Sequence, residues 1–471
     1  MASRTAPGAP RLERRFRLSE RGTSVRTEMV AGVTTFMTMA YILFVNPAIL
    51  GTPGPADDGL AFPAVLTVTA LVAGVMTIAM GVFTNYPFAI ASGLGLNAVV
   101  AFQLVGGEGM TYPEAMGVVV AEGLLLTVLV LAGFREAVMN AIPLELKKAI
   151  GAGIGLFIAI IGFANSGIVI PGPGAGGPVL ARGDVDSARI AVFVVGLLLT
   201  ALLVARRTKG ALLFGILGTT VLATVVNAVA GGRLWDDVGE GVARLPEQVL
   251  ALPDFSLLGA FSFGFVRVGA VAAVLAVFTL LLADFFDTMG TAIALGYEGG
   301  FLDERGSLPR MRRLLVVDGM AAAFGGAASA SSATTYIESA AGISEGGRSG
   351  LASVVTGVLF LAALFISPLA GVIPPEATAP ALILVGFLMM SVIRDLPWDD
   401  YSVAIPAFLT MVVMPFNFSI TDGIGWGFIS YTVIQLALGR WRNVHPLMAV
   451  SSLFFFVYFA LDPIRRLVGL G

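Results

Sequence analysis

The sequence predicts an all-α polytopic membrane protein, and three observations support this fold class. Of its 471 residues, 57% are hydrophobic and only 13% are charged, roughly half the charged share of a typical soluble domain. The mean hydropathy is +0.90, and apolar stretches long enough to cross a bilayer recur along the chain. The 58 glycines are typical of membrane helices that pack closely or are interrupted.

The composition also excludes several function classes. The chain has no cysteine and one histidine, His445, so neither a thiolate nor a histidine-rich metal centre is expected. No glycine-rich phosphate loop followed by Lys-Ser or Lys-Thr is present, and no nucleophile–base constellation appears. The net charge of −3 gives no indication of a nucleic-acid partner. We therefore expect no cofactor, no metal and no enzymatic activity, and an ion gradient is the expected driving force.

Fourteen apolar windows are predicted as core spans, after a polar N-terminal tail at 1–27 that is expected to be cytoplasmic. They lie near 28–50, 61–83, 87–104, 113–133, 146–166, 188–205, 210–230, 266–296, 311–328, 330–344, 348–370, 378–394, 399–416 and 422–439. With the arginine-rich tail inside, the loops after even-numbered spans carry the basic residues, as the positive-inside rule requires. These residues are Arg135, Lys147, Lys148, Arg206, Arg207, Lys209, Arg305, Arg310, Arg312, Arg313, Arg348, Arg394, Arg440 and Arg442. The long acidic loop at 231–265 falls outside.

A fifteenth window at 444–461 breaks this pattern, because Arg465 and Arg466 would lie outside. It is either a true span or a helix at the interface, and we interpret it as an accessory C-terminal segment.

The third and tenth windows are poor helices. Each has a half rich in small or β-branched residues, followed by a short helical half, and about 240 residues separate them. Seven spans per half give the two halves opposite orientations. Interrupted spans in corresponding positions indicate a transporter's binding site near the membrane midplane. The alternative is that the glycines and serines only permit close packing.

Polar residues inside these interruptions favour the binding-site interpretation. Glu338 follows Thr334-Thr335 and opens the helical half of the tenth span, while Asn97 lies at the corresponding place in the third. A charge at this depth is costly and is seldom kept without a function. The structural alternatives are a helix-terminus role for Glu338 and interhelical hydrogen bonding for Asn97.

The eighth span carries two more acids, Asp284 and Asp287, with Thr291 one turn later. Because the acids are three residues apart, they lie on one helix face, and their repulsion favours a shared proton. A purely structural role stays open, above all for Asp284.

Other polar residues receive weaker assignments. The face of the first span that contains Phe36 is polar and aromatic enough to cover a flat ligand. Glu122 and Asp318 are expected to bridge helices, and Glu345 and Arg348 are expected to pair at a span end.

Four strings resemble the AzgA-like adenine/guanine/hypoxanthine permeases of the nucleobase:cation symporter (uracil/xanthine permease) superfamily. They are GVTTFMTMAYILFVNP at 32–47, ASGLGLNA at 91–98, ADFFDTMGT at 283–291 and SSATTYIESAAGISEGGRSG at 331–350. The resemblance runs from about residue 16 to 460. It implies a seven-plus-seven inverted repeat with short strands in spans 3 and 10. The core domain would be 28–133 (spans 1–4) and 266–370 (spans 8–11), and the gate domain 146–230 (spans 5–7) and 378–439 (spans 12–14).

The resemblance also implies a function. The protein would be a multi-pass importer of hypoxanthine, guanine or adenine in a bacterial plasma membrane, working by an elevator mechanism and forming a homodimer. The buried carboxylates favour protons as the coupling ion, with sodium as the alternative. The substrate would contact Glu338, Asp287, Asn97, Thr335, Phe36 and Thr291, and the coupling proton would use Asp287, Glu338 or Asp284. The alternatives are an anion carrier or a xanthine/uracil transporter of the same architecture. Two acids in the site disfavour an anion carrier, and departures from the xanthine and uracil signatures at Asp287 and Ser339 favour 6-oxo or 6-amino purines.

Overall fold

The computed structural model describes residues 11–56, 59–133, 142–172, 180–183, 185–238, 241–246, 248–303 and 308–467. Arg135 and Arg305, which were used to assign topology, lie outside these ranges. Eight of the described helical segments are long and apolar enough to cross a membrane, and four further apolar helices are shorter.

Each predicted span of the first half has a counterpart in the structure. After the polar helix α1 (Arg11–Phe16), span 1 consists of α2 (Val25–Met39) and α3 (Ile42–Leu50), and span 2 is α4 (Phe62–Thr84). Span 3 consists of β1 (Ile90–Ser92), α5 (Leu94–Ala98) and the π-helix η2 (Val99–Val105). Spans 4 to 7 are α6 (Tyr112–Leu131), α8 (Leu144–Asn165), α9 (Ala188–Ala205) and α10 (Ala211–Val229). A small hairpin of β2 (Val169–Pro171) and β3 (Leu180–Arg182) precedes α9.

The second half repeats this order. Spans 8 and 9 are α11 (Ala270–Glu298) and α12 (Met311–Ala327), and span 10 consists of β4 (Ala333–Thr335) and α13 (Ser339–Ser344). Spans 11 to 14 are α14 (Gly350–Ala362), α16 (Pro375–Met390), α17 (Tyr401–Asn417) and α18 (Ile420–Ala437), with α15 (Ser367–Ala370) between α14 and α16. The accessory helix α19 (Pro446–Leu467) packs on α18, where the Phe455 and Phe428 rings meet edge to face.

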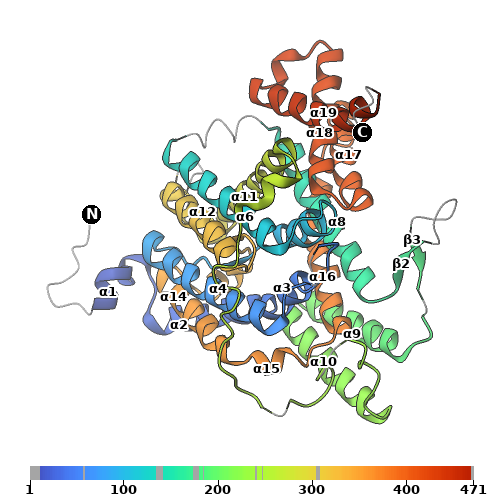
Figure 1. Ribbon diagram of the computed structural model, residues 1–471. Coiled ribbons are helices and arrows are strands. Elements are labelled where there is room, and N and C mark those ends of the chain that lie inside the picture. Colours follow the sequence, from blue (N-terminus) through green and yellow to red (C-terminus); the bar gives the residue numbers. More distant parts are fainter. Residues whose placement is uncertain are drawn as a thin grey trace.

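The two halves interleave, which gives the predicted seven-plus-seven arrangement. In Figure 1, α4 and α6 lie beside α12 and α14, whereas α8 lies beside α16 and α17. Each side of the molecule therefore contains helices from both halves.

The two interrupted spans meet through their strands. β1 pairs antiparallel with β4, with Ile90 opposite Thr335, Ala91 opposite Thr334 and Ser92 opposite Ala333. The predicted strand-then-helix form of spans 3 and 10 is confirmed.

Neighbouring groups satisfy the backbone of these strands, as is required at membrane depth. The Tyr336 N–H donates to the Ala89 carbonyl, and the Ala89 N–H donates to the Ser339 hydroxyl. The Ile90 N–H donates to the Thr77 hydroxyl of α4. The broken segments are thus held rigidly by the helices around them.

Glycines bring helices on the same side into backbone contact. A Cβ added to Gly350 of α14 would lie 1.9 Å from the carbonyl oxygen of Gly81 in α4, and one added to Gly155 of α8 would lie 2.7 Å from that of Gly386 in α16. Only glycine permits this approach, which explains part of the high glycine content.

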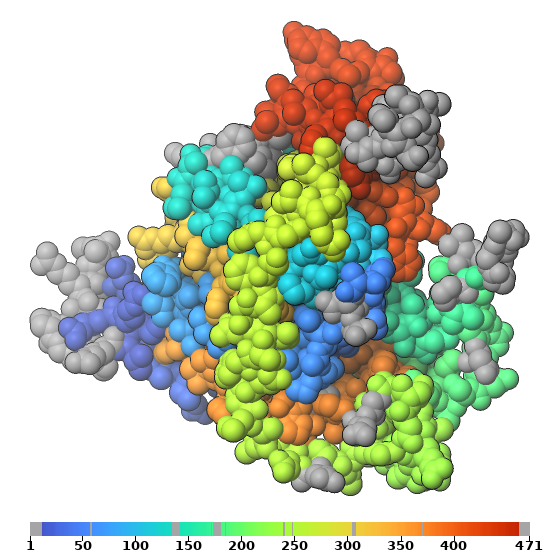
Figure 2. Space-filling model, viewed as in Figure 1, coloured from blue at the N-terminus to red at the C-terminus, as the bar shows by residue number. Residues whose placement is uncertain are grey.

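The connection between α10 and α11 crosses the face of the molecule as a strap (Figure 2). Its backbone is fixed to α6, α12 and the end of α14: Ser262 N–H donates to Pro113, Gly259 to Ala327 and Ala251 to Phe365. The Arg267 guanidinium, in the 3₁₀ helix η3 (Phe263–Val268), pairs with Glu114. The loop predicted to lie outside is therefore an ordered part of the fold.

One predicted ion pair is wrong. Glu345 pairs with Lys209 rather than with Arg348, because the Arg348 guanidinium turns back and donates to the carbonyls of Ile343 and Gly347.

Candidate functional site

Glu338 lies where β4 gives way to α13. Its Oε1 accepts a hydrogen bond of 2.7 Å from the Tyr41 hydroxyl, between α2 and α3. The Thr38 hydroxyl lies 3.3 Å from the Glu338 carbonyl oxygen. The side chain is half-buried, so the carboxylate is held in place by one donor and can accept further hydrogen bonds.

Asp287 is the second acid of this site. It lies near the middle of α11 and its side chain is exposed. It is within electrostatic range of Glu338 and of the Tyr41 and Tyr336 hydroxyls. A carboxylate halfway along a spanning helix is costly in contact with lipid, which favours the interpretation that Asp287 and Glu338 face a water-accessible crevice. The structure places the two acids within electrostatic range of each other.

A second group of acids lies behind this opening and is fully buried. It contains Glu122 of α6, Asp284 of α11 and Asp318 of α12. Neither carboxylate oxygen of Asp284 has a hydrogen-bond partner among the described residues, although Glu122 and Thr334 lie within interaction range. Asp284 and Asp287 thus lie in different surroundings: the side chain of Asp284 is buried and that of Asp287 is exposed.

Asp318 organises β4. Its Oδ1 accepts from the Thr335 N–H at 2.9 Å and from the Thr335 hydroxyl at 2.8 Å. Its Oδ2 accepts from the Thr288 hydroxyl of α11 at 2.6 Å, and Thr288 also contacts the Thr334 hydroxyl at 2.6 Å. Glu122 accepts a hydrogen bond from Ser332 at 3.3 Å. Asp318 thus bridges the helices α12 and α11, as predicted, whereas the hydrogen bond of Glu122 goes to Ser332, just before β4, rather than to another helix.

The remaining predicted site residues differ in position. Asn97 of α5 is buried, and neither atom of its amide has a hydrogen-bond partner among the described residues. Thr291 is half-buried, one turn after Asp287. The Thr335 side chain is occupied by Asp318. Phe36 packs edge-on against Phe360 of α14, with ring centroids 5.0 Å apart.

Tyr41 and Tyr336 were not selected from the sequence. The Tyr336 hydroxyl donates to the Ser92 carbonyl and so ties span 10 to span 3. Tyr41 belongs to the polar and aromatic string 32–47, but its partner Glu338 is 297 residues away. The only available signal was the position of a tyrosine in a polar stretch of span 1.

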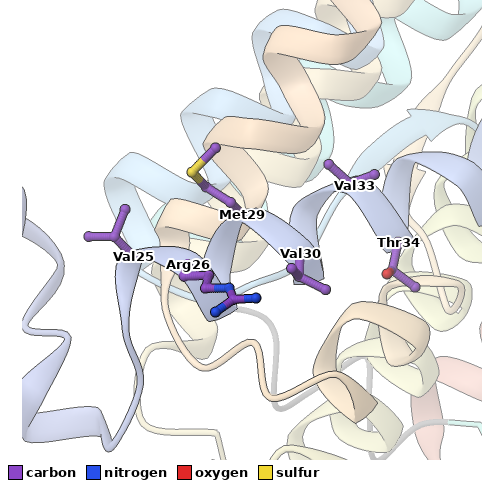
Figure 3. Close-up of a pocket in the computed structure, with 6 residues that line it drawn as sticks. All are labelled: Val25, Arg26, Met29, Val30, Val33 and Thr34. Atoms are coloured by element: carbon purple, nitrogen blue, oxygen red, sulfur yellow. The ribbon is translucent and has the colours of Figure 1, made fainter.

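A hollow of about 630 Å³ lies away from this site, on the outer face of α2. Figure 3 shows its lining, which is formed by Val25, Arg26, Met29, Val30, Val33 and Thr34. It is largely apolar and includes none of the predicted site residues, so it belongs to the surface of the bundle.

Comparison with known proteins now identifies the family. The matching family is described as "Permease family" (Xan_ur_permease), and the match covers residues 26–426. The chain belongs to this permease family. It is a multi-pass transporter of the inner membrane and not an enzyme.

Two curated relatives cover nearly the whole chain of this permease. The adenine permease AdeP of Escherichia coli is 39% identical over 449 residues, which are 95% of this chain and 96% of the relative. The guanine/hypoxanthine permease PbuG of Bacillus subtilis is 39% identical over 452 residues, which are 94% of this chain and 98% of the relative.

Solved structures support the fold. The transmembrane domain of the cyanobacterial bicarbonate transporter BicA matches with a TM-score of 0.62 at 14% identity, covering 84% of this chain and 97% of that one. The murine anion transporter Slc26a9, in its inward-facing state, matches with a TM-score of 0.61 at 13% identity, covering 88% and 68%. These likenesses confirm the predicted architecture of the permease.

Proposed function

We propose that this permease imports purine nucleobases (hypoxanthine, guanine or adenine), coupled to protons, by an elevator-type movement. The observation that carries the proposal is the pair Glu338 and Asp287, two carboxylates at one crevice where the interrupted spans meet. The permeases AdeP and PbuG, which are named for adenine and for guanine and hypoxanthine, are similar over nearly the full chain.

The chemistry of the crevice suits a neutral purine. A purine edge presents N–H donors and ring-nitrogen acceptors, and the carboxylates can accept from the donors. Asn97 supplies an amide whose donor and acceptor are both unused among the described residues. A site built on such pairs discriminates strongly, because an analogue lacking one group leaves a buried partner unpaired.

An anion carrier is the alternative, since BicA and Slc26a9 share this fold. A bound anion requires a positive site, but no arginine or lysine in the described ranges forms an ion pair with Glu338 or Asp287. Two carboxylates would repel an anion. The anion alternative is therefore not favoured.

Elevator movement is supported by a contrast in packing. Helices within 28–133 and 266–370, the proposed core, meet through glycine backbones, as do those within 146–230 and 378–439, the proposed gate. Between the two, Phe157 of α8 meets the ring of Phe102 edge to face, and Gln103 of span 3 hydrogen-bonds to Thr421 of span 14. Side-chain contacts of this kind can be exchanged as one domain moves past the other, whereas interlocked glycine backbones cannot.

Proton coupling is assigned to Asp287, Glu338 or Asp284. Asp284 supports this assignment best, because it is an acid buried without a hydrogen-bond partner among the described residues. A proton would remove the cost of an uncompensated charge there. Glu122 and Asp318 lie close enough to share that proton.

Uptake by the purified permease in proteoliposomes tests the proposal. Labelled hypoxanthine is supplied outside, with an alkaline interior and no sodium gradient. Glu338→Gln and Asp287→Asn should each reduce uptake roughly tenfold or more, as expected for the loss of one charge-assisted hydrogen bond. The matched controls are Glu345→Gln, in the same span, and Glu298→Gln, at the end of α11; both should transport normally.

Counterflow at equal pH separates binding from coupling. Asp284→Asn should exchange internal for external hypoxanthine but fail to concentrate it when the interior is alkaline. Near-normal hypoxanthine uptake by both Glu338→Gln and Asp287→Asn would refute the proposed substrate site. Uptake driven by sodium alone would refute proton coupling.

A further inference from the structure

A second cavity lies at the other end of the molecule from the strap, on the face that the positive-inside rule assigns to the cytoplasm. Its volume is about 500 Å³. It is lined by three arginines, the rings of Tyr86 and Phe301, Pro309 and the turn Gly299-Gly300; the arginines are Arg21, Arg310 and Arg348. We refer to it as the three-arginine pocket.

Four separate connections build this pocket. Arg21 precedes span 1, Tyr86 lies between α4 and β1, Arg310 lies between α11 and α12, and Arg348 lies between α13 and α14. Both halves of the chain therefore contribute, and two contributions come from the connections next to the interrupted spans.

Backbone oxygens hold the arginines in place. Arg21 Nη1 donates to the Arg348 carbonyl at 2.6 Å, and Arg310 Nη1 donates to the Thr84 carbonyl at 2.7 Å. Arg348 Nη1 donates to the Ile343 and Gly347 carbonyls at 2.7 and 2.8 Å. These contacts fix the orientation of each guanidinium. Because carbonyl oxygens carry no formal charge, they do not neutralise the positive charge.

No carboxylate neutralises this cluster among the described residues, because none of the three arginines takes part in an ion pair there. The nearby Glu28 forms no ion pair with them and accepts from the backbone N–H groups of Arg348, Ser349 and Ala352, although its charge partly offsets that of Arg21. Burial and then the Arg310 charge lower the pKa of Arg21. Three half-buried cations close together are costly unless an anion joins them.

We propose that the three-arginine pocket binds a phosphate group. Guanidinium groups match phosphate oxygens in shape and charge, and a cavity of this size admits the phosphate with part of the group that it esterifies. Tyr86 and Phe301, with ring centroids 5.4 Å apart, give one wall an apolar surface. The phosphate comes either from the headgroup of an anionic phospholipid of the inner leaflet or from a soluble compound.

Binding of a phosphate would stabilise the proposed core domain, which is the part of the protein that moves in an elevator mechanism. A phosphate shared by the three arginines would join the N-terminal tail to the connection between α11 and α12 and to the connection that follows the interrupted span 10. This inference does not depend on the transported substrate.

Two probes distinguish the sources on the purified, full-length permease. One is nanodiscs with and without phosphatidylglycerol, and the other is inorganic phosphate added to the protein in neutral lipid. The readouts are the thermal unfolding midpoint and, for phosphate, a dissociation constant. Stabilisation by phosphatidylglycerol alone identifies a lipid headgroup, and saturable binding of inorganic phosphate identifies a soluble source.

The double variant Arg21→Gln/Arg310→Gln should weaken binding roughly tenfold or more, because two charge-assisted contacts are lost. Arg312→Gln, two residues away with its guanidinium on the Leu131 carbonyl, should change it less than about twofold. The single variant Arg348→Lys keeps the positive charge but removes the guanidinium, so it tests whether phosphate binding depends on the guanidinium as well as on the charge. Binding of neither probe, or equal stabilisation of wild type and the double variant, would overturn the proposal.

Discussion

The hydrogen bonds of Asp318 provide the sharpest test of how β4 is held. Replacing Asp318 with alanine removes the acceptor of both the Thr335 N–H and the Thr335 hydroxyl, and also the partner of the Thr288 hydroxyl. Replacing it with asparagine keeps the oxygen that accepts twice from Thr335. The Thr288 hydroxyl can then rotate to accept from the new amide and donate to Thr334.

The two substitutions should therefore differ in magnitude. A buried N–H left without a partner costs about 1–3 kcal/mol, and the two lost hydroxyl contacts add roughly 0.6 kcal/mol each at the strength typical of membrane interiors. Asp318→Ala should thus cost about 3 kcal/mol, and Asp318→Asn under about 1 kcal/mol. If the loss of about 3 kcal/mol falls on the arrangement of β4 that binds the substrate, the affinity for hypoxanthine decreases roughly 150-fold.

Equilibrium binding of labelled hypoxanthine to purified protein, together with thermal unfolding, measures both quantities. We expect Asp318→Ala to bind at least tenfold more weakly than Asp318→Asn. If the two variants were equally impaired, the charge rather than the acceptors would matter, and the reasoning would fail. Wild-type affinity in Asp318→Ala would refute it outright.

Three further predictions concern other parts of the molecule. Tyr41→Phe removes the described donor to Glu338 and should raise the KM for hypoxanthine roughly fivefold, for a loss of about 1 kcal/mol; an unchanged KM would contradict this. Gly350→Ala should lower the unfolding midpoint sharply because its Cβ would lie 1.9 Å from the Gly81 carbonyl oxygen, whereas the control Gly290→Ala, with no atom within 4 Å, should not. Burial raises the pKa of Glu108, in the loop after span 3, to about 7; the folded state thus holds a proton that the unfolded chain releases near 4.5, and stability falls as the pH rises from 4.5 to 7. Glu108→Gln should flatten that dependence in unfolding midpoints measured from pH 5 to 8, and an unaltered slope would show that Glu108 is not its source.

The interruptions and the acid at the start of α13 could be predicted from the sequence because both are local features. Small and β-branched residues do not sustain a helix in spans 3 and 10, and Glu338 follows the β-branched pair immediately. In the structure, β4 ends at Thr335 and α13 begins at Ser339. The pairing of β1 with β4, which joins residues about 240 apart, was not predicted from the sequence.

The different surroundings of Asp284 and Asp287 could not be predicted in this way. A spacing of three residues places both on one side of α11, but the rotation of α11 about its axis decides which acid faces the interior. That rotation depends on α6, α12 and β4, which are distant in sequence. The partners of Glu338 and Asp318, and the contact of the Phe36 ring with Phe360 of α14, were missed for the same reason.

The pairing of β1 with β4 also constrains how the protein is made. β1 enters the bilayer when the ribosome has yet to add more than half of the chain, and its partner residues arrive about 240 residues later. Until then the unpaired strand edge is exposed to hydrocarbon or must be shielded by the insertion machinery. Biogenesis of this permease should therefore be most vulnerable to truncation between the two halves, where a complete first repeat exists with nothing to close it.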